Sequence, residues 1–154
     1  KNPIKKHNTK CLNWNLKDAL KNAERVQTPF TPAVSIILQI HERLLNIDKN
    51  GGAEFEINRI NLIATDFRKS IKNYPFKITS ESLWNAITPL HPLNSSAYDI
   101  FIMLKNEYNI WICPNGGSLK DTILRVGHIG NLTIADNDIL FSALNDMKSK
   151  GLLW

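Results

Sequence analysis

The sequence has few of the residues that build metal centres and disulfide frameworks. Its two cysteines, Cys11 and Cys113, lie far apart, and its four histidines show no HxxxH or HxH spacing. Closely spaced Cys and His pairs are the usual signature of a zinc site, and dense cysteines that of a small secreted domain. The sequence therefore predicts no metal site, and its sparse cysteine favours a reducing compartment, the cytoplasm.

Long apolar runs and basic stripes are also missing. No stretch of about 18 apolar residues is long enough to span a bilayer, and the polar start KNPIKKHNTK lacks the apolar centre of a secretion signal. The net charge is +5, but five of the lysines crowd into the first seventeen positions and the remainder is close to neutral. No basic stripe is interleaved with aromatic residues. We therefore expect no membrane span and no binding of nucleic acid.

What the sequence does contain is enough apolar material for one core. With 154 residues and 43% hydrophobic content, the chain is long enough for one compact domain. Residues 1–15 are rich in lysine and asparagine and include Pro3, so they predict a flexible lead-in, the cut end of a longer protein. The single domain is expected over residues 16–154.

The pattern of apolar residues predicts the elements of that domain. Helical periodicity indicates helices over 16–23, 33–47, 53–74 and 97–108, of which 33–47 is apolar on more than one side and is expected to be largely buried. Runs 76–79 and 84–90 predict a β-hairpin, and 110–113 a third strand. A fourth strand contains Arg125, and a final helix ends at Gly151. This order predicts an α+β two-layer sandwich, a small, mainly antiparallel sheet with helices packed on one face.

Four aromatic residues accompany the predicted strands and the helix between them. They sit at core-like or boundary positions of their elements, so we expect them to pack rather than to stack on a cofactor. They are Trp84, Tyr98, Tyr108 and Trp111.

The stretch QTPFTPAV, residues 27–34, holds two threonines between rigid prolines. Thr31 is placed as an N-cap, with Pro32 at the first helical position. The exposed N–H groups of a helix start attract anions, phosphate included. An ordinary helix start is the alternative interpretation.

The stretch TILRVGHIGNLT, residues 122–133, places the charged Arg125 among the apolar residues of a strand. Gly127 and Gly130 allow the backbone to turn sharply or to approach a ligand closely, and Thr133 with Asp136 predicts a capping box for the last helix. A charge in such a strand needs a partner. It is either one of the chain's own carboxylates or an anionic ligand.

Taken together, QTPFTPAV, HP, ICPNGG and RVGHIG resemble the C-terminal part of class V, fold-type I aminotransferases. These pyridoxal-phosphate enzymes include the serine-pyruvate, alanine-glyoxylate and 2-aminoethylphosphonate-pyruvate transaminases. The resemblance extends over nearly the whole chain from about Leu16. It implies that residues 16–154 are the small C-terminal domain of such an enzyme.

The resemblance also implies roles for particular residues. Arg125 would grip the substrate's carboxylate, while Thr28 and Thr31, with Gln27, would reach the cofactor phosphate of the other subunit in a homodimer. The lysine that binds the cofactor would precede residue 1, so no catalytic residue is expected here and the chain alone should be inactive. The parent enzyme would transfer an amino group from an amino acid or aminophosphonate to a 2-oxo acid such as pyruvate or glyoxylate. The alternative is a free-standing α+β module that binds a carboxylate or a partner without catalysis.

Overall fold

A computed structural model describes residues 11 and 14–152 of the chain. These residues divide into two compact units, the first ending at Asn46 and the second beginning at Ile47. Most of the predicted lead-in, residues 1–15, lies outside the described residues. That lead-in and the single domain over residues 16–154 both stay predictions.

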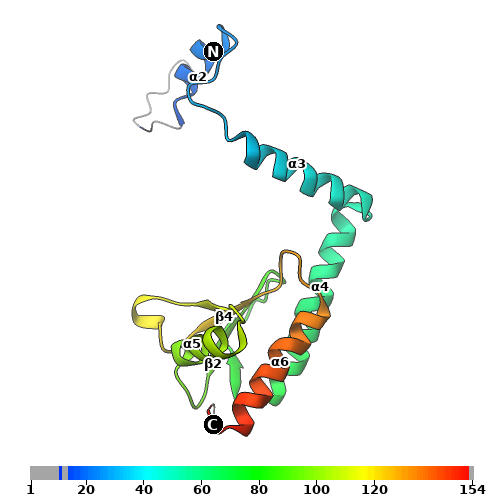
Figure 1. The fold of residues 1–154 in the computed structure, drawn as a ribbon, viewed down its shortest axis with the longest axis vertical. Coiled ribbons are helices and arrows are strands. Elements are labelled where there is room, and N and C mark those ends of the chain that lie inside the picture. The colour runs from blue at the N-terminus through cyan, green and yellow to red at the C-terminus, as the bar shows by residue number, and fades with distance from the viewer. Residues whose placement is uncertain (1–10, 12–13, 153–154) are drawn as a thin grey trace. The chain divides into compact units, whose positions relative to one another are not determined.

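The first unit contains helix α2 (Leu16–Ala23), as predicted, and most of helix α3 (Val34–Lys49), drawn in blue to cyan in Figure 1. Asn15 caps α2, because its side-chain oxygen accepts a hydrogen bond from the Asp18 N–H at 3.2 Å. Neither helix has a buried residue. The expectation that α3 is largely buried is therefore wrong; Ile37, for example, is 57% exposed.

The second unit is built on a four-stranded antiparallel sheet in the order β1-β2-β4-β3. Its strands are β1 (Phe76–Ile78), β2 (Ile87–Pro92), β3 (Cys113–Pro114) and β4 (Leu124–Gly127). The predicted hairpin is confirmed, since Phe76 pairs with Pro92 and Ile78 with Leu90. Strand β3 is shorter than expected, because residues just before it complete the end of a helix: Asn109 has φ 54° and the Ile110 N–H donates to the Leu104 carbonyl.

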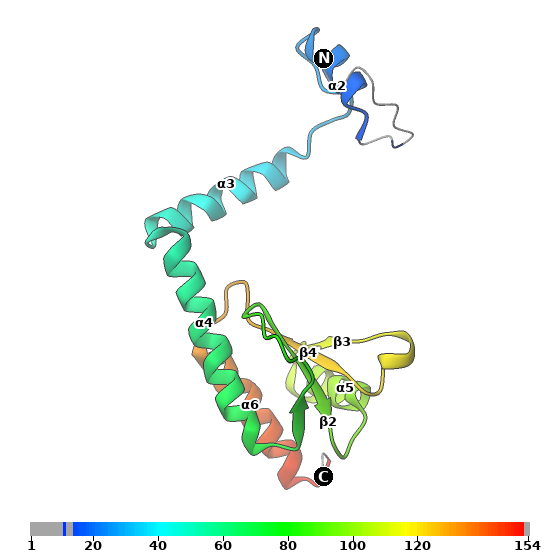
Figure 2. The ribbon, with the colours of Figure 1, turned by 180° about the vertical axis from the view of Figure 1, so that it is seen from behind.

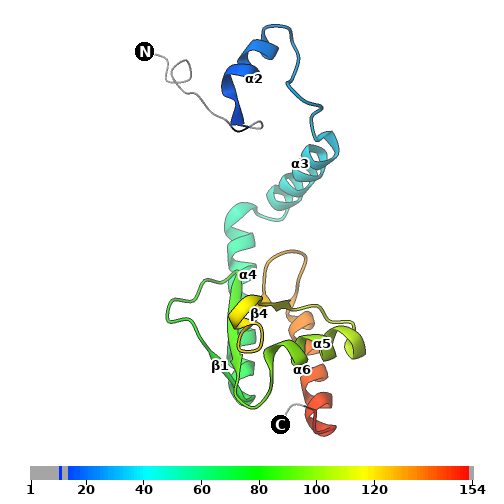
Figure 3. The ribbon, with the colours of Figure 1, turned by 90° about the vertical axis from the view of Figure 1, so that its left-hand side faces the viewer.

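Three helices cover one face of this sheet. They are α4 (Gly52–Ser70), α5 (Ala97–Tyr108) and α6 (Ile134–Ser149), and a short 3₁₀ turn (Ile71–Asn73) follows α4 while another (Gly117–Leu119) precedes β4. Helices α4 and α6 lie side by side (Figures 1 and 2), and α5 lies on the same side of the strands as α6 (Figure 3). The α+β two-layer fold predicted from the sequence is confirmed.

The core lies between the sheet and these helices. Phe67 from α4, Ile100 from α5 and Leu144 from α6 meet Leu124 and other strand residues in one buried cluster. Side-chain caps begin helices α5 and α6. Ser96 caps α5, and Thr133 with Asp136 forms the capping box of α6, with the Thr133 N–H donating to Asp136 Oδ2 at 2.7 Å.

The four aromatic residues pack less completely than predicted. Tyr98 and Tyr108 pack against the core, and the Tyr108 hydroxyl donates to Asp146 Oδ2 at 2.7 Å. Trp84 and Trp111, however, are 77% and 71% exposed. Trp111 still meets the edge of Phe101, with ring centroids 5.4 Å apart. The two tryptophans belong to a turn and to the segment before β3, outside the regular ladder, so the sheet does not cover them.

Candidate functional site

Arg125 lies in β4, flanked by β2 and β3. Leu124 and Val126 point into the core, and side chains alternate along a strand, so Arg125 points to the face opposite the helices, here called the outer face. Its partners across the sheet are Pro89 on β2 and Cys113 on β3. The Pro89 carbonyl accepts a hydrogen bond from the Thr79 N–H. Proline has no backbone N–H, so the one backbone polar group of Pro89 faces β1 rather than β4. Pro89 and Arg125 therefore form a non-hydrogen-bonded pair, in which the side chains lie closest.

The charge of Arg125 has no carboxylate partner within the described part of the chain. Its Nη2 donates to the Pro114 carbonyl at 3.2 Å, and its Nε is buried with no hydrogen-bond partner in the residues that the structure describes. A guanidinium has five N–H donors, and here a neutral carbonyl satisfies one of them. The alternative in which Arg125 pairs with a carboxylate of this chain is thus not found among the described residues. A half-buried cation with free donors is suited to an anionic ligand.

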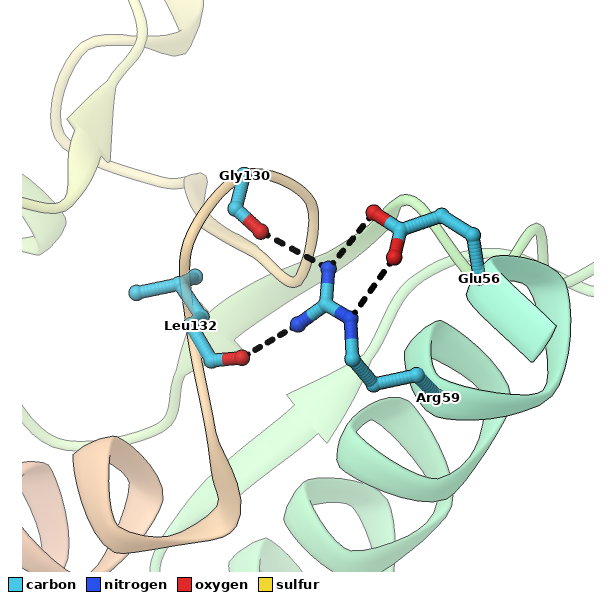
Figure 4. Close-up of polar contacts among 4 residues, drawn as sticks. All are labelled: Glu56, Arg59, Gly130 and Leu132. Carbon is cyan, nitrogen blue, oxygen red and sulfur yellow. Dashed lines mark hydrogen bonds and ion pairs between the residues drawn. The ribbon is translucent and has the colours of Figure 1, made fainter. Parts of the chain in front are cut away.

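The connection after β4 is tied to helix α4 by Arg59 (Figure 4). Arg59 Nη2 donates to the Gly130 carbonyl at 2.8 Å and Nη1 donates to the Leu132 carbonyl. Its Nε and Nη2 also bind the two carboxylate oxygens of Glu56 at 2.9 and 2.8 Å. The carboxylate raises the pKa of Arg59 and orients its planar fork. The loop that follows Arg125 is therefore held in one position.

His128 anchors the same connection from inside. Its side chain is fully buried, and its Nε2 lies 2.8 Å from the Thr88 hydroxyl. Arg68 Nε donates to that hydroxyl at 3.0 Å, so Thr88 links the buried His128 ring to helix α4. The other ring nitrogen, Nδ1, is buried and has no hydrogen-bond partner among the described residues. Burial and, secondarily, the charge of Arg68 lower the pKa of His128 to about 4.

Sequence analysis did not single out Arg59, Arg68 or His128. Arg59 and Arg68 lie on a helix whose polar side looks solvated in sequence, and the partners of Arg59 in the loop are backbone carbonyls more than seventy positions away. Every residue has a backbone carbonyl, so residue types do not reveal which carbonyl will accept a hydrogen bond. The sequence signal for His128 was that it lies in an apolar stretch. The same stretch contains the more conspicuous Arg125.

The predicted phosphate-binding residues come together in the first unit. Gln27, Thr28 and Thr31 line one open hollow of about 710 Å³. All three side chains are exposed, and the Thr28 hydroxyl donates to the Phe30 carbonyl at 2.7 Å. The Thr31 hydroxyl and the Gln27 amide are neutral donors, and a phosphate group accepts such hydrogen bonds; the Thr28 hydroxyl joins them once it turns away from the Phe30 carbonyl. Arg125 belongs to the second unit.

The predicted capping role of Thr31 is wrong. Helix α3 begins at Val34, and the Val34 N–H donates to the Pro32 carbonyl at 2.8 Å. This bond spans two residues instead of the four of an α-helix, so the chain at Pro32 and Ala33 is a turn and not a first helical turn. The Thr31 hydroxyl is therefore available for other contacts.

Two further expectations concern metals and membranes. Within residues 11 and 14–152, no group of three or more His, Cys, Asp and Glu could hold a metal ion. Cys11 and Cys113 are both exposed. Among the helices in the described ranges, none is long and apolar enough to cross a membrane.

Curated proteins similar in sequence carry names of two kinds. A protein of a Synechococcus strain named soluble hydrogenase, small subunit, is 29% identical over 121 residues, 78% of this chain and 31% of that protein. An uncharacterized aminotransferase of Helicobacter pylori is 24% identical over 138 residues, 87% of this chain and 37% of that protein. The chain thus spans about a third of the relatives that it matches. No family profile matches it.

Solved structures with the same fold include aminotransferases. The alanine-glyoxylate aminotransferase of Nostoc sp. superposes with a TM-score of 0.71 at 22% identity, covering 92% of this chain and 39% of that one. The phosphoserine aminotransferase of Cytophaga hutchinsonii gives a TM-score of 0.68 at 17% identity, covering 86% and 37%. The predicted resemblance to aminotransferases is confirmed: the chain has the fold of a part of these enzymes.

Proposed function

We propose that this chain is the small, C-terminal domain of a class V aminotransferase, in which Arg125 binds the substrate's carboxylate. The observation that supports it most directly is the guanidinium of Arg125, which has no carboxylate partner among the described residues and keeps free donors at the outer face of the sheet. The shared fold and the likeness of RVGHIG to the family's motif point the same way.

A carboxylate fits this guanidinium for physical reasons. Two parallel N–H···O bonds match the planar fork to the planar anion, and both bonds are strengthened by charge. The stem of Arg125 lies between Pro89 and Cys113, which leaves it less rotamer freedom than an exposed arginine has. Less ordering is then required when the ligand binds.

Pyridoxal phosphate is the cofactor that this family implies. Gln27, Thr28 and Thr31 fit its phosphate as neutral hydrogen-bond donors, and we infer that they hold it across the interface of a homodimer. When bound, the cofactor supplies an electron sink for charge that develops on the substrate. This chain's own residues supply binding and orientation, with Arg125 fixing the carboxylate end of the substrate.

The reaction that follows is transfer of an amino group from an amino acid or aminophosphonate to a 2-oxo acid such as pyruvate or glyoxylate. The chain matches little more than a third of the aminotransferases above. We therefore place the lysine that binds the cofactor in the remainder of the enzyme. The 154 residues by themselves should be inactive.

Comparing the full-length protein with the 154-residue chain tests this proposal. The full-length protein should bind pyridoxal phosphate stoichiometrically and transaminate an amino acid with glyoxylate or pyruvate, measured by product formation. The isolated chain should fold, yet form no stoichiometric, reducible link between added cofactor and a single lysine. Transamination by the isolated chain would contradict the domain assignment. A full-length protein that binds carboxylates without transamination would favour the binding-module alternative.

Replacing Thr28 and Thr31 together by valine should weaken cofactor affinity in the full-length protein. Each lost hydrogen bond to a charged phosphate is worth about 1.5 to 3 kcal/mol, and both hydroxyls line the same hollow. Cofactor retention after dialysis measures the effect, at a matched dimer fraction. Thr65→Val, on the exposed side of α4, is the control and should retain cofactor normally. Unchanged retention in the double variant would remove both threonines from the site.

A further inference from the structure

Gly127 is the last residue of β4 and lies two positions after Arg125 on the outer face. Its partner on β2 is Ile87, whose side chain points to the same face. Residues two apart in a strand are separated by roughly 6.6 Å. A side chain at position 127 would therefore be the next one along this face of the strand after the aliphatic part of the Arg125 side chain.

Neither the backbone nor the packing of this chain explains a glycine there. Five other glycines adopt left-handed φ values between 58° and 108°, but Gly127 is not among them. A Cβ built on Gly127 meets no atom of the described residues within 4 Å, its two chain neighbours aside. Glycine in a strand costs stability relative to alanine, and it often marks the place where a ligand approaches the backbone.

We propose that Gly127 determines which substrates fit at Arg125, because the carbon chain next to the bound carboxylate passes over its missing side chain. This inference rests on the proposed function and adds a specificity residue to the same site. Arg125 supplies the free donors for the carboxylate. Gly127 supplies the open space beside it, and Ile87 supplies an apolar wall across the strand pair.

The physical consequence is a size limit. A methyl group at position 127 takes space from the ligand, since apart from its chain neighbours no atom of the described residues lies within 4 Å of it. One carbon group of this size, when it does not fit its pocket, changes kcat/KM by roughly 10-fold or more. The penalty should grow with the bulk of the substrate's chain, and it should be greater for valine than for alanine.

The test uses the full-length protein with glyoxylate, pyruvate, 2-oxobutyrate and 2-oxoisovalerate as amino acceptors. Gly127→Ala should lower kcat/KM progressively along this series, by roughly 10-fold or more for the largest acids. In the 154-residue chain, the same substitution should raise the melting temperature by roughly 1 to 4 °C, because its φ suits alanine and its surroundings are open.

Gly116→Ala is the matched control. Gly116 also has a φ that alanine adopts (−117°) and no atom within 4 Å of a built Cβ, but it lies in the turn before β4. It should raise the melting temperature in the same way without changing the acceptor series. Equal kcat/KM for wild type and Gly127→Ala along the series would overturn the proposal. A loss of equal size for every acceptor would also overturn it, because a distorted strand acts on all substrates alike.

Kinetics of Arg125→Lys and Gly127→Ala together distinguish a failure of this inference from a failure of the proposed function. If Arg125→Lys leaves kcat/KM unchanged, the carboxylate role of Arg125 fails and the specificity role fails with it. If Arg125→Lys impairs turnover while Gly127→Ala has no effect, the specificity role of Gly127 alone is overturned.

Discussion

Arg125→Lys in the full-length protein should lower kcat/KM for the amino donor by about 2 to 4 kcal/mol, roughly 30- to 1,000-fold, while cofactor affinity is unchanged. Lysine keeps the positive charge, but a compact ammonium cannot form two parallel N–H bonds to one carboxylate. The loss should fall on both substrates, since amino acids and 2-oxo acids share the carboxylate. Steady-state kinetics with donor and acceptor varied separately measure it.

The stability of the 154-residue chain provides the control for this prediction. Arg125 makes one hydrogen bond to a neutral carbonyl, so its replacement by lysine should shift the free energy of unfolding by less than about 1.5 kcal/mol. Arg59→Lys is the structural counterpart, because Arg59 is bound to Glu56 and to two loop carbonyls. It should destabilise the chain more than Arg125→Lys does. A marked fall in melting temperature for Arg125→Lys, with normal kcat/KM, would make Arg125 a structural residue.

The stability of the chain should fall steeply in mild acid because of His128. The pKa of this buried side chain is lowered to about 4 in the folded state from the ordinary value of 6.5. Between these values the unfolded chain binds a proton that the folded chain does not, so the free energy of unfolding decreases as the pH decreases. At 1.36 kcal/mol for each pKa unit, the loss reaches about 3 kcal/mol by pH 4. Above pH 6.5 this contribution is complete.

Denaturant unfolding at a series of pH values, for wild type and His128→Gln, measures this effect. Carboxylates also titrate near pH 4, so the relevant quantity is the difference between the two proteins. His128→Gln should be less stable than wild type at pH 7.5, because the Thr88 hydroxyl loses its fitted partner, and the difference should shrink toward pH 4. His41→Gln, at an exposed position of α3, should leave the pH profile intact. Parallel profiles for wild type and His128→Gln would contradict the assignment.

Helix α3 shows what an apolar pattern does and does not determine. Its residues repeat with helical periodicity, and the helix forms where that pattern predicts. Apolar periodicity indicates that a side of the helix packs against other residues. It does not show whether those residues belong to the same 154-residue chain. In this structure none of its residues is buried. The prediction of the element was right, and the prediction of its burial was wrong.

Local physics explains why most of the fold could be read from the sequence. Caps at Ser96 and Thr133 act over three residues, and strand alternation acts over two, so both are visible as short patterns. The α+β class follows from the order of such elements. Strand β3 is shorter than predicted because the Ile110 N–H donates a hydrogen bond to the Leu104 carbonyl at the end of α5. Apolar periodicity does not show such a backbone hydrogen bond.

Sequence by itself determined that a charged residue, Arg125, stands among apolar strand residues and needs a partner. Only the tertiary structure decided that this partner is not a carboxylate among the described residues, and that Gly127 leaves open space on the same face. It also decided that Arg59 holds the loop after β4 through backbone carbonyls and that His128 is buried against Thr88. These contacts join residues 40 to 73 positions apart. Their partners are fixed by how the elements pack, which residue types and spacing alone do not specify.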